Sequence, residues 1–555
     1  MLRQFYLKNG YADARIISAT ADLDRDGRGF FITFTIDEGE RYRFGYIDIE
    51  SALPSLNVDE LRGVILTRTG KRYNSEKVEK TVEALTVMVS KQGYAFGQVR
   101  PRFERDQATH TMNIAYVIDE GPRVYIERIN IVGNFRTEDR VIRRQFRLAE
   151  GDAYNRLLVD SARKRLKRTG FFKDVNIETE PGSAPDRVIL VVNVVEQPTG
   201  ELSFGVGFST SEGVIGDVSI TERNVMGKGQ YVRLGFAGSF DRAQFDFSFT
   251  EPHFLDRNMA AGFDLFHKTV DLRDEASFRQ RDTGANLRVG FAIANNAQLG
   301  LRYRFQREEI FDATTNASLA VKDAAAEGAV HVSSLGYTVA YDTRNLVQSP
   351  TSGVFASFSQ DLAGLGGDVN YIRSVADARG YYPITNKLTL VGRMQGGAIE
   401  GYGGNDLRLT DLFFKGGETV RGFDRAGYGP RDACENAATG DRISNCSRDS
   451  IGGKYFWATN AELRFPFPLI PDNFGMSGAI FLDAGSLWEP GARAATAITD
   501  EGSFIFDSSE VRMSTGFSII WQSPLGPLRA DIAEALLKAD FDRTELFRFG
   551  ASTNF

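Results

Sequence analysis

The sequence predicts a mixed fold, with tandem α+β domains over residues 1–199 and an antiparallel transmembrane β-barrel of about 16 strands over residues 200–555. Three observations predict this fold. A unit of about 80 residues repeats in the first 200 residues, and strict apolar alternation fills the remainder. No apolar run approaches the roughly 18 residues of a membrane-spanning helix. The 56 Gly and 42 Phe, with 25% charged residues, exclude disordered and collagen-like chains.

The repeated unit is marked by glycine–aromatic pairs. Gly10-Tyr11, Gly93-Tyr94 and Gly170-Phe171 lie 83 and 77 residues apart, and each precedes an alternating run that ends at an acidic turn. Helical patterns occupy residues 75–91 and 155–168, where apolar residues recur at helical spacing. Each unit therefore reads β-α-α-β-β, which predicts an array of small domains.

These repeats set the expected domain boundaries. Residues 1–38 hold only the end of one unit, whereas 39–120 and 121–199 hold complete units. Net charge changes from +3 over residues 1–200 to −10 over the remainder, and neither value indicates nucleic acid as a partner. Met1 is followed by no apolar signal segment, so we interpret the sequence as a fragment or a mature form.

Helical periodicity almost disappears after residue 200. Alternating apolar residues replace it, for example over 202–208, 287–293 and 299–305. A soluble β-sandwich has the same period. Some 355 residues of strands without helices, with aromatic residues at the strand ends, favour a barrel in a bilayer, and about 22 residues per strand and turn correspond to about 16 strands.

The final strand ends the chain with an aromatic residue. One face carries Phe547, Phe549, Ala551, Thr553 and Phe555. This pattern resembles the C-terminal assembly signal of bacterial outer-membrane barrels, and an ordinary final strand is the alternative.

A motif opens a long polar loop, about 416–453, which we call loop six. Val420, Arg421, Gly422 and Phe423 resemble the loop-six motif of the barrel superfamily that inserts or exports β-rich proteins. In that superfamily the loop folds into the lumen, and its arginine pairs with inward acids on the next strands. Parity matches Glu462 and Asp483 to these acids, although Phe481 on the same side leaves the direction of Asp483 open.

The physical chemistry of Arg421 agrees with that resemblance. A guanidinium inside a barrel is costly unless it is paired, and its planar fork matches carboxylates. Gly422 allows a tight backbone turn beside it. The alternative is that Arg421 faces solvent in a surface loop.

The whole chain is identified as a member of the POTRA-plus-barrel insertase superfamily. The repeats resemble POTRA domains, whose fold is β-α-α-β-β, and four segments resemble the BamA family in particular: residues 133–137, 170–172, 205–210 and 523–529. The resemblance implies that the three units are the third, fourth and fifth of five POTRA domains.

This resemblance implies folding and insertion of β-barrel proteins into the outer membrane of a Gram-negative bacterium, with the POTRA domains in the periplasm. The implied partners are unfolded barrel clients, periplasmic accessory lipoproteins, periplasmic chaperones and the lipid bilayer, with no nucleic acid. Exposed edge strands such as 112–118 and 188–194 are expected to bind clients or lipoproteins by strand pairing, and the sequence leaves open which edges are free.

Barrel closure joins the first strand, about 201–210, to the last, about 546–555. Glycines leave both strands poorly packed, and together with the resemblance they predict a lateral seam that opens and templates client strands. The seam residues are Leu202, Phe204, Gly205, Val206, Gly207, Phe549, Gly550 and Phe555.

Cys434 and Cys446 are the only cysteines, 12 positions apart in loop six. An even pair in a polar loop favours a disulfide in an oxidising compartment, and two free loop thiols are the alternative.

No motif indicates a catalytic site, a metal site or a cofactor. The four His are scattered, and the sequence contains no HExxH, CxxC, P-loop or nucleophile elbow. We therefore do not expect an enzyme. The alternatives are a TamA-like translocation and assembly factor, a two-partner secretion pore, a passive porin and an enzymatic barrel.

Overall fold

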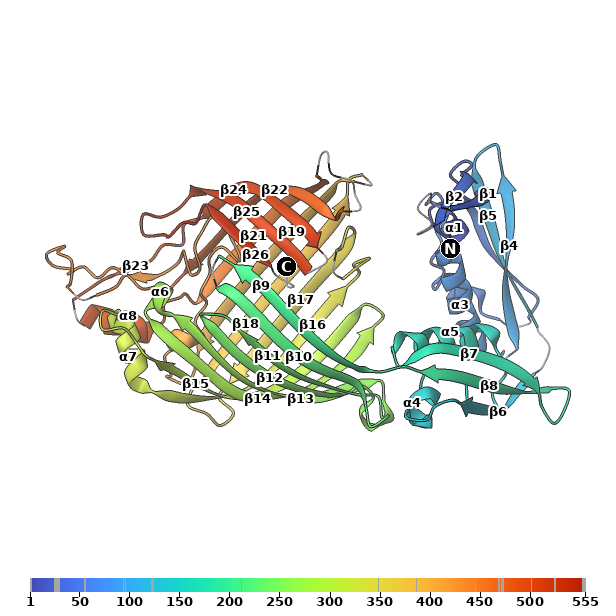
Figure 1. The fold of residues 1–555 in the computed structure, drawn as a ribbon, viewed down its shortest axis with the longest axis horizontal. Helices are drawn as coiled ribbons and strands as arrows, with labels where there is room; N and C mark the ends of the chain where they lie inside the picture. Colours follow the sequence, from blue (N-terminus) through green and yellow to red (C-terminus); the bar gives the residue numbers. More distant parts are fainter. Residues whose placement is uncertain are drawn as a thin grey trace. The chain divides into compact units, whose positions relative to one another are not determined.

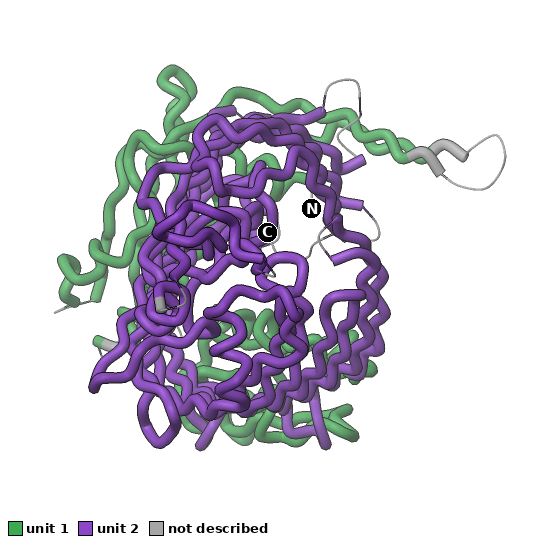
Figure 2. Tube along the Cα trace, turned by 90° about the vertical axis from the view of Figure 1, so that its left-hand side faces the viewer, with its two compact units in different colours: residues 1–199 green, residues 200–555 purple. Residues whose placement is uncertain are grey.

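In the computed structural model the chain forms two compact units, Met1–Thr199 and Gly200–Phe555 (Figure 2). The structure describes all residues except 1, 24–29, 54–55, 93, 95, 121–123, 211, 348, 386, 445, 468–469, 471–473, 501, 524–525 and 552–555. Within the described residues, no helix combines the length and the apolar character needed to cross a membrane.

The described residues of the first unit form one two-stranded sheet and two three-stranded sheets. Helix α1 (Leu2–Lys8) precedes the antiparallel strands β1 (Arg15–Leu23) and β2 (Phe30–Asp37). Two complete domains follow, and they confirm the predicted β-α-α-β-β order. Their elements are β3 (Arg43–Ser51), α2 (Val58–Arg62), α3 (Ser75–Lys91), β4 (Gly97–Asp106) and β5 (Thr111–Glu120), then β6 (Tyr125–Val132), α4 (Asp139–Arg143), α5 (Arg156–Arg168), β7 (Phe172–Pro181) and β8 (Arg187–Glu196).

The long helix of each domain begins after an asparagine. The side chain of Asn74 accepts the N–H of Lys77 at 3.1 Å, and Asn155 accepts the N–H of Leu157 at 3.0 Å. These bonds satisfy donors that a helix start leaves unpaired. The apolar face of each helix then packs on its sheet, and each domain has its own buried core.

The prediction that strands 112–118 and 188–194 are sheet edges is wrong. They belong to β5 and β8, which are the central strands in the orders β3-β5-β4 and β6-β8-β7. Each pairs in parallel with the first strand of its domain and antiparallel with the preceding strand. Alternation shows that one face of a strand is covered, but it does not show how many neighbours the strand has.

The second unit is a closed antiparallel barrel of 16 strands, as predicted (Figure 1). The barrel strands are β9 (Gly200–Ser209), β10 (Gly213–Val225), β11 (Gln230–Gly238), β12 (Arg242–Glu251), β13 (Met259–Leu272), β14 (Phe278–Ala294), β15 (Ala297–Phe311), β16 (Ala329–Asp342), β17 (Gly353–Ala363), β18 (Tyr371–Pro383), β19 (Thr389–Gly401), β21 (Tyr455–Pro466), β22 (Met476–Trp488), β24 (Arg512–Ser523), β25 (Gly526–Leu537) and β26 (Phe547–Ala551).

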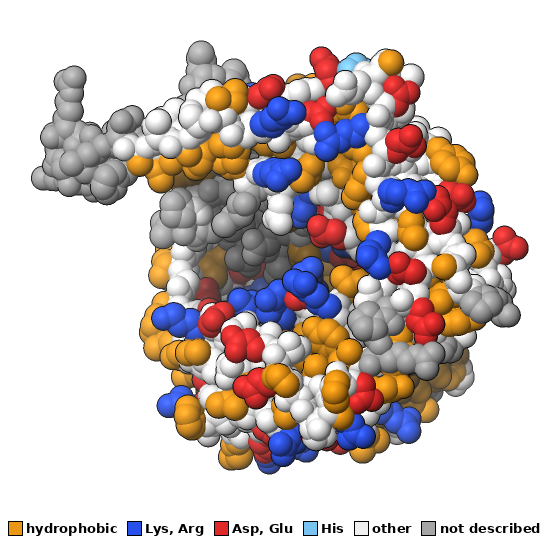
Figure 3. Space-filling view, turned by 90° about the vertical axis from the view of Figure 1, so that its right-hand side faces the viewer, with side chains coloured by type: hydrophobic (Ala, Val, Ile, Leu, Met, Phe, Trp, Pro, Cys, Tyr) orange, Lys and Arg blue, Asp and Glu red, His pale blue; other side chains and the backbone are white. Residues whose placement is uncertain are grey.

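Alternate residues of the barrel strands face opposite sides of the wall. On β14, Leu287 is exposed, whereas Arg288 beside it pairs with Asp264 of β13 at 3.0 Å. Figure 3 shows charged side chains of both signs interspersed with hydrophobic ones over one face of the molecule. An apolar outer surface with a polar interior is the arrangement expected for a barrel in lipid.

The expectation that this part of the chain has no helices is wrong. The loops contain η1 (Phe254–Asp256), α6 (Arg273–Ala276), α7 (Leu319–Glu327), η2 (Leu409–Asp411) and α8 (Ala492–Asp500), and the short strands β20 (Arg431–Asp432) and β23 (Ile505–Phe506) form a separate pair. Helices α6, α7 and α8 contribute to one buried cluster with Leu409 and Ile451. These helices are too short for a pattern that is visible in sequence. They pack with loop six at one end of the barrel.

Candidate functional site

A tight turn of loop six presents Arg421 inside the barrel. Gly422 has φ +86°, a backbone conformation that glycine adopts without strain. On either side of the arginine, Val420 and Phe423 are fully buried in an apolar cluster. The hydroxyl of Thr419 donates to the backbone O of Gly416 at 2.9 Å and closes the start of the turn. Burial of the apolar neighbours therefore fixes where the guanidinium points.

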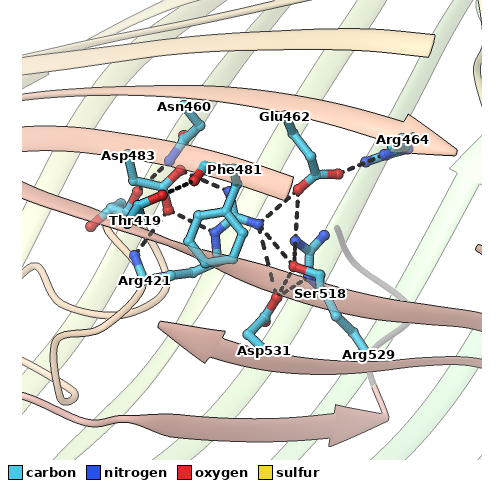
Figure 4. A network of polar contacts seen from close by, with 11 residues as sticks. Thr419, Arg421, Asn460, Glu462, Arg464, Phe481, Asp483, Ser518, Arg529 and Asp531 are labelled. Atoms are coloured by element: carbon cyan, nitrogen blue, oxygen red, sulfur yellow. Dashed lines mark hydrogen bonds and ion pairs between the residues drawn. The ribbon is translucent and has the colours of Figure 1, made fainter. Parts of the chain in front are cut away.

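Arg421 binds two carboxylates from neighbouring strands (Figure 4). Its Nε and Nη2 donate to the two oxygens of Asp483, each at 2.7 Å, and its Nη1 donates to Oε2 of Glu462 at 2.7 Å. Its backbone N–H also donates to Asp483 at 3.1 Å. Two parallel bonds to one carboxylate fix the plane of the guanidinium as well as its position.

The two acids reach Arg421 because strand register places them side by side. Asn460 of β21 is opposite Asp483 of β22, and Glu462 is opposite Phe481. All face the interior, and Asp483 is fully buried. Asp483 therefore points into the barrel, a direction that the sequence left open. Phe481 points inward as well, and the centroid of its ring lies 3.5 Å from Cζ of Arg421. A cation over an aromatic face is favourable.

Two further arginines complete the network, and the sequence did not reveal them. Arg529 of β25 donates to Glu462 at 2.7 Å and to Asp531 at 2.8 Å, and Arg464 donates to Glu462 at 2.6 Å. Three guanidinium groups thus face three carboxylates, so their formal charges balance. Strand parity with Asp531, two residues later, was the available signal for Arg529, which also lies in the segment 523–529.

The buried network is held by pairing. Separating charges from water is costly, and a buried pair is stable only when each group keeps its partners. Glu462 accepts bonds from all three arginines, so it is the shared partner of loop six, β21 and β25. This arrangement binds loop six to three barrel strands. Each of its three carboxylates accepts a bond from an arginine, and the hydroxyl of Ser518 donates to Asp531.

Cys434 and Cys446 are joined by a disulfide within loop six. Asp432 lies beside them, and these three residues are the only His, Cys, Asp or Glu group in the described part of the chain that is close enough to hold a metal ion. Because the two sulfur atoms are bonded to each other, they are not thiolate ligands. The disulfide instead closes a short loop within loop six, where the backbone N–H of Cys434 donates to Asp432 at 2.8 Å.

Strands β9 and β26 close the barrel. Register pairs Gly550 with Ser209, and among the described residues this is the only register pair between the two strands. By contrast, β9 pairs with β10 over its whole length, from Gly200 to Ser209. Most of the first strand therefore has one described neighbour in the barrel instead of two.

The predicted seam residues divide into two groups. Leu202, Phe204 and Val206 are exposed on the outer surface, whereas Gly205 faces the side chain of Asp217 on β10. Gly205 is not opposite Gly550, so a cross-link between those positions would not match the register. Gly207 pairs with Ile215. Phe549 contacts Phe208 with 6.4 Å between ring centroids, and Phe555 lies outside the described residues.

Comparison with known proteins identifies both parts of this architecture. Residues 224–555 match the Omp85 superfamily domain. Residues 42–121 and 124–197 match the POTRA domain, described as a surface antigen variable number repeat.

Curated relatives extend the match across the chain. The chain is 28% identical to the outer membrane protein assembly factor BamA of Neorickettsia risticii, over 100% of this chain and 71% of the relative. It is 30% identical to the factor of the same name from Nitratidesulfovibrio vulgaris, over 95% of this chain and 63% of the relative. The chain thus spans less than two thirds of the second of these relatives.

A solved structure has the same fold. The crystal structure of BamA from Haemophilus ducreyi lacking POTRA domains 1–3 matches with a TM-score of 0.67 and 24% identity, over 92% of this chain and 99% of that chain. At this identity the likeness supports the fold alone.

Proposed function

The chain belongs to the Omp85 superfamily, and from this premise we propose that it folds and inserts β-barrel proteins into the outer membrane of a Gram-negative bacterium. Its relatives named as outer membrane protein assembly factors support this proposal. The POTRA domains lie in the periplasm, and the partners are unfolded barrel clients and the other components of the assembly machine.

The observation that carries the proposal is that one register pair, Ser209–Gly550, joins the described residues of the first and last barrel strands. A strand that enters hydrocarbon must pair its backbone N–H and C=O groups, because no water is present to bind them. The edge of β9 has only the Ser209–Gly550 register pair on that side among the described residues. An incoming client strand pairs with this edge by β-augmentation, and the seam opens laterally to receive it.

The client's own folding supplies the free energy for insertion in this proposal, and the protein acts as a template without covalent catalysis. Arg421, bound by Asp483 and Glu462, keeps loop six inside the barrel while the seam opens and closes. The outer strands β3, β4, β6 and β7, which flank the two central POTRA strands, are the pairing edges for clients and periplasmic accessory lipoproteins.

Depletion of the full-length protein tests the proposal. Several unrelated outer-membrane barrels are followed by their resistance to unfolding in SDS. Loss of all of them is the expected result for a general insertase. Loss of a single class would indicate a dedicated exporter or a TamA-like factor instead, and normal assembly of every barrel would refute the proposal.

A further inference from the structure

Loop six is bonded through its backbone to the connection between β25 and β26. Phe423, two residues after Arg421, forms an antiparallel bridge with Thr544. Three backbone hydrogen bonds extend this pairing: Asp424 N–H to Arg543 O (3.0 Å), Arg543 N–H to Gly427 O (2.8 Å) and Glu545 N–H to Gly422 O (3.1 Å). The turn that presents the lumenal arginine is therefore paired with the segment that leads into the last strand.

Side chains extend this connection to the first strand. Arg548 of β26 donates from Nη2 to the backbone O of Phe423 at 3.4 Å and pairs with the carboxylate of Glu545 at 2.7 Å. The hydroxyl of Thr210, which directly follows β9, donates to the same carboxylate at 3.4 Å. Gly417 leaves room for the guanidinium, since a Cβ there would lie 2.5 Å from Cζ of Arg548. A chain of polar contacts thus runs from loop six to both seam strands.

This chain of contacts ends at the bonds that close the barrel. The N–H of Thr210 donates to the backbone O of Phe549 at 2.9 Å, and the N–H of Phe549 donates to the Thr210 hydroxyl at 3.3 Å. Together with the Ser209–Gly550 register pair, these bonds close the seam at the loop-six end of the barrel. Thr210 takes part in each of these side-chain and backbone bonds to Phe549, so a displacement of Thr210 weakens the described closure of the seam.

We propose that Arg548 and Glu545 are positioning residues that couple the seating of loop six to closure of the β9–β26 seam. The inference rests on the proposed function, in which this seam receives client strands. While loop six is seated, Phe423 offers its carbonyl to Arg548, and the pair keeps Glu545 beside Thr210. When loop six is displaced, Arg548 loses this acceptor and the Thr210 bonds weaken. Seating of loop six therefore sets how often the seam opens.

Amide hydrogen exchange of the peptide 200–210 tests the coupling, with the full-length protein in lipid nanodiscs. Arg548→Met removes the donor to Phe423, and Thr210→Val removes the hydroxyl at the other end of the chain of contacts. Both variants are expected to raise exchange of the Thr210 amide about tenfold, the change that follows the loss of one charge-assisted hydrogen bond. Arg302→Met is the matched control, because Arg302 is also a lumenal arginine and pairs with Asp361 at 2.6 Å. It is expected to leave exchange of the peptide unchanged.

Glu545→Gln provides a second variant that keeps the side-chain shape and loses the ion pair, in case Arg548→Met does not fold. The coupling would be overturned if Arg548→Met and Glu545→Gln fold and their residue-210 amide exchanges as slowly as in the wild type. This outcome would hold whatever Thr210→Val shows. Client insertion is measured on the same preparations. Faster exchange with an unchanged rate of client insertion would uphold the coupling and contradict the proposed function. Failure of the coupling and failure of the proposed function are therefore distinguishable.

Discussion

Arg421 is the residue on which the position of loop six depends. It contributes a bidentate bond to Asp483, a bond to Glu462 and a cation–π contact with Phe481. Its side chain is only 12% exposed, so water does not replace these partners when they are removed. Through this one side chain, the network adds three charged and aromatic contacts to the backbone bonds that hold loop six.

Arg421→Ala is expected to destabilise the barrel by about 3–5 kcal/mol, because it leaves buried carboxylates without their cation. The unfolding midpoint in urea, read by mobility in SDS, measures this loss. Arg421→Lys keeps the charge but loses the bidentate geometry. Its unfolding midpoint should therefore lie between those of the wild type and the alanine variant. An alanine variant as stable as the wild type would show that loop six does not depend on this residue.

Glu196 gives a pH-dependent contact in the last POTRA domain. Burial raises its pKa, but bonds from Thr137 and from the backbone N–H groups of Arg136 and Phe135 outweigh burial and hold the pKa of Glu196 below its usual range. A lowered pKa stabilises the folded form above the unfolded pKa, and this contribution is lost as pH falls through the folded pKa. Protection of the 133–137 amides, which is their exchange rate relative to the intrinsic rate at the same pH, should therefore fall in acid below the usual carboxyl pKa. Glu196→Gln should remove the dependence, and an identical acid profile in this variant would contradict it.

Individual site residues were predictable only where two signals coincided. For Glu462 and Asp483, strand parity agreed with the motif that requires an acid. For Arg464 and Arg529, strand parity was the only signal. Phe481 entered the prediction only because it made the direction of Asp483 ambiguous. Which inward residues meet depends on register between β21, β22, β24 and β25, and a single sequence does not encode register visibly.

Among the strands, glycine determines which charges can reach one another. Arg302 of β15 pairs with Asp361 of β17 across the intervening strand β16. Gly336 of β16 lies beneath this pair, and a Cβ there would lie 3.0 Å from Nε of Arg302 and overlap Oδ1 of Asp361. The missing side chain provides the space for an ion pair between strands that are not neighbours.

Gly336→Ala is expected to separate that ion pair and to destabilise the barrel by about 1–3 kcal/mol through overpacking. Gly392→Ala on β19 is the matched control, since nothing lies within 4 Å of its added Cβ. Urea denaturation of the two variants provides the comparison. Equal midpoints would show that the space over Gly336 has no structural role.

Alternation and helix spacing predicted most elements, including helices 75–91 and 155–168. They did not predict strand order within the POTRA sheets, because β5 and β8 alternate in the same way whether they have one neighbour or two. The loop helices α6, α7 and α8 were missed because each is held by packing against loop six rather than by its own periodicity. Local pattern thus predicts an element but not its neighbours.

For the whole molecule, repeats and alternation together predicted a mixed chain of POTRA domains and a 16-stranded barrel, and the fold confirms this class. Barrel closure is a different kind of property. It depends on how far the first and last strands overlap, and this overlap is small among the described residues. The register makes Ser209 and Gly550 the informative pair of positions for a cross-link.

The seam is tested most directly by joining its register partners. Ser209→Cys and Gly550→Cys are combined, with Cys434 and Cys446 replaced by serine, and the oxidised protein is assayed for insertion of a β-barrel client. Oxidation is expected to stop insertion while the barrel stays folded, and reduction is expected to restore it. Full insertion by completely cross-linked protein would contradict a seam that opens to template client strands.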